Sequence, residues 1–162
     1  HWHPQPHRVI AEWARVLRTD GLLMFSCFGP DTFVELREAF AINGLRERVL
    51  PFVDLHDYGD MLVAAGMATP VMDMEKLTVT YGSVDKLLAD VKAFGGNPLE
   101  GRPRGLDGAQ AWQRLRRTLE SARDPSGNLR LTIEVIYGHA FRPTPTLTRE
   151  GEHIVRFDRL KK

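Results

Sequence analysis

The stretch GLLMFSCFGPDT, residues 21–32, decides the fold class of this chain. From Leu22 to Phe28 it is an apolar run interrupted only at residues 26 and 27, which is typical of a strand covered by helices on both faces. The segment 29–32 breaks the run. Thr32, followed three residues later by Glu35, predicts a capping box at the start of a helix. We therefore expect a strand that leads directly into a helix.

The sequence on either side of this stretch repeats the same two patterns. Apolar residues at helical spacing predict further helices, and alternating apolar and polar residues predict further strands. The helices are expected near residues 6–18, 33–43, 54–66, 84–95 and 107–122, and the strands near 71–81 and 129–141. Such interleaving of helices and strands predicts a layered α/β domain.

Length and composition exclude several classes of protein. The chain has 162 residues, enough for one domain with a core, and 22 basic against 21 acidic residues give a net charge of +1, which gives no general reason to expect a nucleic-acid partner. No apolar run approaches the roughly 20 residues needed to span a bilayer, so we expect no membrane segment. The single cysteine, Cys27, excludes an internal disulfide and favours a reduced, cytoplasmic setting.

Few residues suggest acid–base, nucleophilic or metal chemistry. His1, His3 and His7 lack nearby acidic ligands, so we expect no metal site there. Cys27 ends a strand and is either a nucleophile or, as we favour, a buried inert thiol. The pair at residues 56 and 57 is either an acid–base pair or, more simply, a helix start.

The most informative charge cluster is rich in arginine. Residues 102–130 contain seven arginines and three acidic residues, so this stretch carries a charge of +4 in a nearly neutral chain. The cluster is either a solvated helix face or a surface that binds an acidic partner, because guanidinium groups match carboxylates and phosphates. The arginines are Arg102, Arg104, Arg114, Arg116, Arg117, Arg123 and Arg130.

Several blocks together resemble one known family. The stretch VLRTDGLLMFS, residues 16–26, resembles the segment around the fifth strand of class I S-adenosylmethionine (SAM) methyltransferases. The blocks that follow, in the same order, resemble the malonyl-acyl-carrier-protein O-methyltransferases of biotin synthesis over about residues 1–143. These blocks are FGPDT (28–32), ELR (35–37), DLHDYG (54–59), GM (66–67), PVMD (70–73), LTVTY (77–81) and EVIYGHA (134–140).

The resemblance implies the C-terminal half of a Rossmann-like, seven-stranded SAM-methyltransferase fold with a mixed sheet. Residues 22–28 would be strand five and residues 71–81 strand six. Residues 129–141 would be an antiparallel strand seven inserted between them. Residues 1–143 would belong to the methyltransferase domain, with a helical insertion or lid at 84–128 between strands six and seven, and 144–162 would be a polar tail. The family's glycine-rich SAM loop would lie upstream, so this chain alone is expected to be inactive and to expose the edge of 22–28 for association.

The resemblance also implies a reaction and a partner. The family transfers the methyl group of SAM to the free carboxyl of a malonyl group on acyl carrier protein. A related mitochondrial protein that assembles complex I and hydroxylates arginine shares some of the blocks, so an arginine hydroxylase stays an alternative. A noncatalytic binding module on the same fold is a further alternative.

Site residues follow from the same topology, without a catalytic residue being assigned. Trp2 would follow strand four and contact the cofactor. The substrate pocket would be formed by Ser26, Cys27, Phe28, Gly29 and Tyr81, with Arg37, Arg102 or Arg104 loosely orienting the malonyl carboxylate. Strand seven runs the other way, so His139 would be structural, and the carrier protein would dock on Arg102, Arg104, Arg114, Arg116 and Arg117.

Overall fold

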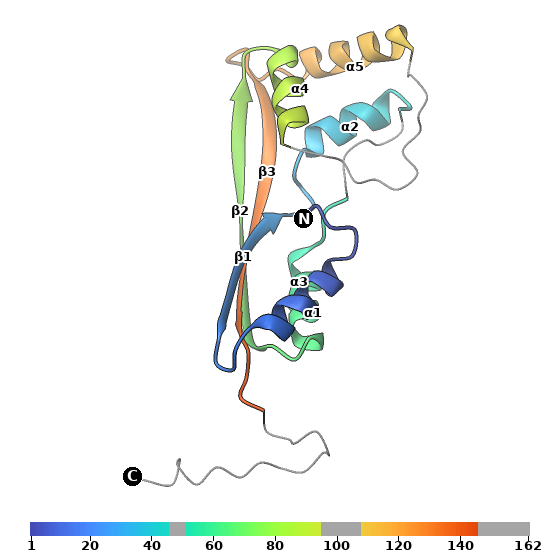
Figure 1. Ribbon diagram of the computed structural model, residues 1–162. Coiled ribbons are helices and arrows are strands. Elements are labelled where there is room, and N and C mark those ends of the chain that lie inside the picture. The colour runs from blue at the N-terminus through green and yellow to red at the C-terminus, as the bar shows by residue number, and fades with distance from the viewer. Residues whose placement is uncertain (46–50, 95–107, 146–162) are drawn as a thin grey trace.

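The computed structural model describes residues 1–45, 51–94 and 108–145, and it confirms the predicted order of elements (Figure 1). Helices and strands alternate much as the sequence patterns indicate, with element ends moved by a few residues. The elements are α1 (Pro6–Val16), β1 (Leu22–Phe28), α2 (Val34–Ile42), α3 (Leu55–Ala64), β2 (Ala68–Tyr81), α4 (Val84–Ala93), α5 (Ala109–Ser121) and β3 (Leu129–Phe141).

The three strands form one sheet in the order β1-β3-β2. β3 pairs antiparallel with both neighbours, so β1 and β2 run in the same direction on either side of it. Phe28 at the end of β1 lies opposite Val135 of β3. The expected insertion of the last strand between the other two is confirmed.

Local chemistry explains where the helices begin. Pro6 occupies the first turn of α1, where its missing N–H costs nothing. The Asp54 carboxylate accepts a hydrogen bond of 2.8 Å from the His56 amide at the start of α3, and the Ser83 hydroxyl accepts one of 3.3 Å from the Lys86 amide at the start of α4. His56 and the first-turn Asp57 thus occupy a helix start, as the simpler interpretation predicts.

Two apolar cores hold the helices on the sheet. In Figure 1, α1 and α3 lie beside the lower half of the sheet, and α2, α4 and α5 gather at its upper end. The lower core joins Ile10, Cys27, Tyr58, Leu62, Met67, Ile136 and Ala140. The upper core is built around Phe33, Leu36, Phe40, Phe52, Tyr81, Val84, Leu87, Leu115, Leu119, Leu129, Leu131 and Ile133.

One face of the lower sheet is uncovered, which corrects the expectation that β1 is buried on both faces. Within the described residues, α1 and α3 cover only the face that carries Cys27. On the other face Met24 keeps 71% of its surface exposed, because no described helix packs there. The strand register places five exposed apolar side chains on this uncovered side. Together they form what we call the bare face: Leu22, Met24, Val71, Tyr137 and Phe141.

Candidate functional site

Aromatic rings converge at the C-terminal end of β1. The Phe28 ring lies 4.4 Å from that of His1, 5.7 Å from that of Phe52 and 5.9 Å from that of Phe94, measured between ring centroids. The Trp2 ring lies 6.2 Å from that of Phe52. The structure therefore brings together Trp2 and Phe28, the residues that the sequence places beside the cofactor and in the substrate pocket.

The loop that follows β1 is fastened to the central strand. The Gly29 amide donates to the Glu134 carbonyl at 2.9 Å, and the Asp31 amide donates to Glu134 Oε2 at 2.6 Å. The Thr32 hydroxyl donates to the Glu134 carbonyl and accepts from the Glu134 amide, both at 3.0 Å. Since every one of these bonds involves Glu134, this single residue ties down residues 29–32, which we call the clamped loop.

Two cations hold the same loop from other elements. Lys76, the register partner of Glu134 on β2, forms an ion pair with Asp31. The hydrogen bond from Lys76 to Asp31 is the main cause that raises the lysine pKa, with a smaller contribution from the charge of Glu134. Arg37 on α2 donates to the carbonyl of Pro30. Arg37, expected to orient a substrate carboxylate, thus binds the loop that would line the pocket.

A strained residue, Phe33, directly follows the clamped loop. Phe33 has φ 62°, in the left-handed region that costs a non-glycine residue about 1–2 kcal/mol. Its amide donates to the Thr132 carbonyl at 2.8 Å, and its ring is buried in the upper core. These interactions hold Phe33 in this conformation, which lets the chain turn from the loop into α2.

The expected capping box at Thr32 and Glu35 is wrong. Phe33, not Thr32, is the N-cap of α2, and no side chain caps it. Both predicted capping side chains cross to β3 instead. Thr32 bonds to the backbone of Glu134, and the Glu35 carboxylate accepts from the Thr132 amide at 2.9 Å and from the Thr132 hydroxyl at 2.6 Å. β1 stops opposite Val135, so these backbone groups of β3 lack a strand partner on that side and bind the loop and α2.

The remaining strand residues proposed for the pocket are placed apart. Cys27 points into the lower core, whereas Ser26 lies on the opposite side of β1 and is exposed. Tyr81 pairs with Leu129, six register positions beyond the Val135 level of Phe28, or roughly 20 Å along the strand. Tyr81 is buried in the upper core, where burial is the main cause that raises its pKa and a hydrogen bond to Asp90 contributes.

Cys27 is a protected thiol. Its side chain is 5% exposed, and burial raises its pKa, although a hydrogen bond with Tyr58 lowers it slightly. Burial also raises the pKa of Tyr58. A neutral thiol in an apolar core is a weak nucleophile, as the sequence interpretation favoured.

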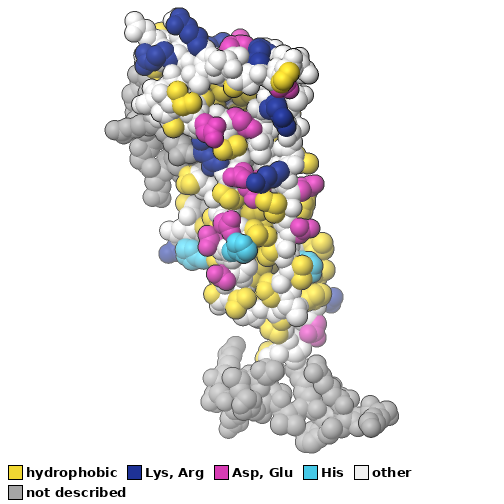
Figure 2. Space-filling view, turned by 180° about the vertical axis from the view of Figure 1, so that it is seen from behind, with side chains coloured by type: hydrophobic (Ala, Val, Ile, Leu, Met, Phe, Trp, Pro, Cys, Tyr) yellow, Lys and Arg dark blue, Asp and Glu magenta, His cyan; other side chains and the backbone are white. Residues whose placement is uncertain are grey.

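Two arginines of the cluster are held by ion pairs or hydrogen bonds in the described part of the chain. Arg116 on α5 pairs with Asp85 on α4 and lowers its pKa. Arg123 donates to Glu120 and to the carbonyls of residues 82 and 127. Arg114 and Arg117 are exposed on α5, and Figure 2 shows Lys and Arg side chains at the end of the molecule that α4 and α5 form. Arg102 and Arg104 lie outside the described residues.

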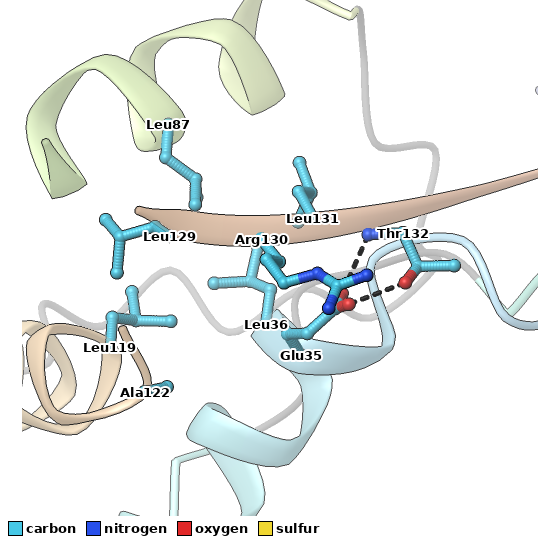
Figure 3. A pocket seen from close by; sticks show the side chains of 9 residues that line it. All are labelled: Glu35, Leu36, Leu87, Leu119, Ala122, Leu129, Arg130, Leu131 and Thr132. Carbon is cyan, nitrogen blue, oxygen red and sulfur yellow. Dashed lines mark hydrogen bonds between the residues drawn. The ribbon is translucent and has the colours of Figure 1, made fainter. Parts of the chain in front are cut away.

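A cavity of about 290 Å³ lies between α2, α4, α5 and β3 (Figure 3), and Tyr81 is the register partner of Leu129 in its lining. Leucines form its apolar lining, and the hydrogen-bonded pair of Glu35 and Thr132 lies at one side together with Arg130. Sequence reasoning did not single out this cavity. Its lining is Glu35, Leu36, Leu87, Leu119, Ala122, Leu129, Arg130, Leu131 and Thr132.

The described part of the chain carries neither a metal-ligand cluster nor a membrane-spanning helix. No group of three or more His, Cys, Asp or Glu side chains there is arranged to hold a metal ion. His3 Nδ1 accepts a hydrogen bond of 3.0 Å from the Gln5 amide. Among residues 1–45, 51–94 and 108–145, none of the helices has the length and apolar character to cross a bilayer.

The geometry and the comparisons define the class of fold. No family model matches the chain. Among solved structures, the YcgJ protein of Bacillus subtilis matches with a TM-score of 0.51 and 16% identity, covering 90% of this chain and 61% of that one. A proposed methyltransferase of Bacillus halodurans matches with a TM-score of 0.51 and 15% identity, covering 89% of this chain and 61% of that one. Together with the inserted antiparallel β3, these matches identify a partial Rossmann-like methyltransferase fold.

Curated relatives make the resemblance more specific. The chain is 49% identical over 160 residues to a malonyl-[acyl-carrier protein] O-methyltransferase of Laribacter hongkongensis, covering 96% of this chain and 54% of the relative. It is 51% identical over 146 residues to the protein of the same name from Gallionella capsiferriformans, covering 90% of this chain and 50% of the relative. The resemblance expected from the sequence blocks is therefore confirmed, and the chain spans about half the length of these relatives.

Proposed function

We propose that this chain is part of a SAM-dependent O-methyltransferase that methylates the free carboxyl of a malonyl group on acyl carrier protein, in the synthesis of a biotin precursor. The observation that carries the proposal is the 49% identity to the Laribacter relative over nearly the whole chain. The relatives compared carry the methyltransferase name, so an arginine hydroxylase is not favoured. A noncatalytic binding module is the remaining alternative.

The proposed chemistry needs no catalytic base. A malonyl carboxylate is ionised at neutral pH and already nucleophilic, so rate acceleration comes from in-line positioning and exclusion of water. The shifted pKa values in the described chain belong to the buried Cys27–Tyr58 pair and to groups held by hydrogen bonds.

The residues at the end of β1 fit only part of a SAM site. SAM supplies an electrophilic methyl group on a positively charged sulfur when it is bound. Trp2 would contact the cofactor and Phe28 would line the substrate pocket beside it, because aromatic faces suit both a flat base and a cation. The loop after β1 holds one glycine between Phe28 and Asp31, and its Gly29 and Asp31 amides already donate to Glu134, so these two amides would not bind SAM.

The partner would approach the upper end of the molecule. An acyl carrier protein is acidic, and a basic helix face beside the pocket would steer the encounter. Arg114 and Arg117, both exposed on α5, support this proposal. Arg116 supports the helix pair through Asp85 rather than presenting a free charge.

The decisive experiment uses the full-length protein with SAM and malonyl-carrier protein. We expect mass spectrometry to detect the methyl ester of the malonyl group. Acetyl-carrier protein, which lacks the free carboxyl, is the matched substrate control and should stay unmodified. Unmodified malonyl-carrier protein, with hydroxylated arginine in a protein substrate incubated with O2 and a reductant, would favour the hydroxylase instead. Product from neither substrate would favour the binding module.

A further inference from the structure

Apart from tyrosines and cysteine, the described part of the chain buries two polar side chains, those of Thr32 and Glu134. Both take part in the hydrogen bonds that hold the clamped loop on β3. Thr32 is 0% exposed and Glu134 is 3% exposed. Burying a carboxylate is costly unless its oxygens are hydrogen-bonded. Glu134 meets this cost at the Asp31 amide, at the end of the strand that carries Phe28.

The fit between Glu134 and the loop depends on a glycine. A Cβ placed on Gly29 would lie 2.5 Å from Cδ and 2.8 Å from Cγ of Glu134. Real Cβ atoms do not approach so closely, so the carboxylate occupies the space that a side chain at position 29 would need. The loop backbone therefore lies directly against the buried carboxylate.

Charge complementarity explains why a carboxylate suits this place. The Asp31 amide is a hydrogen-bond donor, and Lys76, one strand further on, holds the Asp31 side chain. Glu134 and Lys76 are paired in register. Glu134 therefore binds the backbone amide of Asp31, and Lys76 binds the side chain of the same residue. Charged hydrogen-bond acceptors bind backbone amides more strongly than neutral ones do.

We propose that Glu134 is a positioning residue, whose buried carboxylate fixes the position of the Gly29–Asp31 backbone beside the aromatic rings that converge at the end of β1. This inference rests on the proposed function for its consequence in methyl transfer. In layered α/β sheets, ligands bind beyond the carboxyl ends of the strands, where this loop lies. A displacement of about 1 Å in such a loop can reduce turnover roughly a hundredfold.

The test compares Glu134→Gln, Glu134→Ala and the control Glu75→Gln in the full-length protein. Glu75 is an exposed carboxylate on the same sheet, bonded to the Tyr137 hydroxyl. We expect Glu134→Ala to lower kcat by roughly tenfold or more while leaving the KM for carrier protein unchanged. We expect Glu134→Gln, which keeps an acceptor oxygen, to retain part of the activity, and Glu75→Gln to retain all of it.

A readout independent of activity accompanies the kinetics. Hydrogen exchange at the Asp31 amide should accelerate in Glu134→Ala at a temperature where exchange in the lower core is unchanged. Gly29→Ala should be strongly destabilised in wild-type background and partly rescued by Glu134→Ala, because the second change removes the atoms that the new Cβ meets.

These measurements distinguish the positioning role of Glu134 from the proposed methyltransferase function. A folded Glu134→Ala with wild-type kcat and wild-type exchange at Asp31 would overturn the positioning role, as would a loss of kcat that only follows the loss of folded protein. If the wild-type protein methylates no malonyl-carrier protein, the proposed function fails, and exchange at Asp31 together with the Gly29 rescue still decides whether Glu134 positions the loop.

Discussion

At the scale of single residues, burial decides what Cys27 can do. Its folded-state pKa is raised, so its contribution to stability is fully present below the ordinary value of 9.0 and is lost as pH rises through the folded pKa. We therefore expect a thiol reagent to label the folded chain at pH 8 much more slowly than free cysteine or the unfolded chain. Labelling of the folded chain at the rate of free cysteine would show that the lower core is open.

His139, on the central strand β3, is expected to affect stability rather than methyl transfer. It lies opposite Met24 and Val71, four register positions from the Val135 level of Phe28, or roughly 14 Å from the aromatic end of β1. We expect His139→Ala to cost about 1 kcal/mol in the free energy of unfolding, as partly buried substitutions do. Methyl transfer by the full-length variant, assayed at low temperature where it stays folded, should be unchanged. A well-folded variant without activity would contradict this placement.

Sequence reasoning at this scale placed Trp2 and Phe28 at one end of β1 but did not single out Glu134, which holds the loop beside them. Trp2 and Phe28 could be predicted because strand ends in a recognised topology meet at one edge. Glu134 was missed as a site residue. It stands in the alternating run of β3 between Ile133 and Val135, and a charge there was an available indication of a buried polar contact. Its partner is a loop about a hundred residues earlier in the chain, and no local pattern reports such a contact.

At the scale of elements, α5 offers a test of partner binding. Arg114 and Arg117 lie three residues apart on its exposed surface, whereas Arg116 is bound to α4. Replacing Arg114 and Arg117 with Ala should raise the KM for carrier protein and flatten its dependence on salt, with kcat nearly unchanged.

The control for this charge change is Arg15→Ala on α1. Arg15 is exposed and pairs with Glu12 near the lower half of the sheet, so its loss should leave the KM unchanged. Steady-state kinetics at low and high salt measure both variants. An unchanged KM for the α5 variant at low salt would mean that the arginines form only a solvent-exposed helix face and do not bind the carrier protein.

The elements themselves were largely predictable, and the exceptions have one physical cause. Helix starts at Asp54 and Ser83 depend on neighbours in sequence, and the sequence predicts them. The pair Thr32 and Glu35 matches the capping pattern equally well, yet both side chains bind β3. Backbone groups of β3 beyond the end of β1 compete for them, and this competition depends on strand length, which sequence spacing does not report.

At the scale of the whole molecule, the bare face determines how the chain behaves alone. Exposed apolar side chains on a sheet, next to the free edge of β1, favour association between copies. We expect the 162-residue chain to associate at rising concentration in sedimentation experiments. Met24→Lys should weaken this association, and Val63→Lys, an exposed apolar position on α3, should not. A monomer at all concentrations would contradict this expectation.

The overall arrangement was predictable because a resemblance supplied the topology that spacing alone could not. Alternation predicts that residues 129–141 form a strand, but the place of that strand between β1 and β2 came from the related family. Burial was less predictable. The run from Leu22 to Phe28 is apolar on both sides, whereas its exposure depends on which segments cover each side.

The central position of β3 also sets the order of events during synthesis. β1 and β2 do not pair with each other. Both pair with β3, which is synthesised last of the three strands. The strand that completes β1 leaves the ribosome roughly a hundred residues after it, or roughly 5 to 20 seconds later at ordinary rates of translation. During that interval the edge of β1 that pairs with β3 lacks this partner. A nascent chain stalled before residue 129 should therefore be a preferred client of chaperones that shield exposed strands.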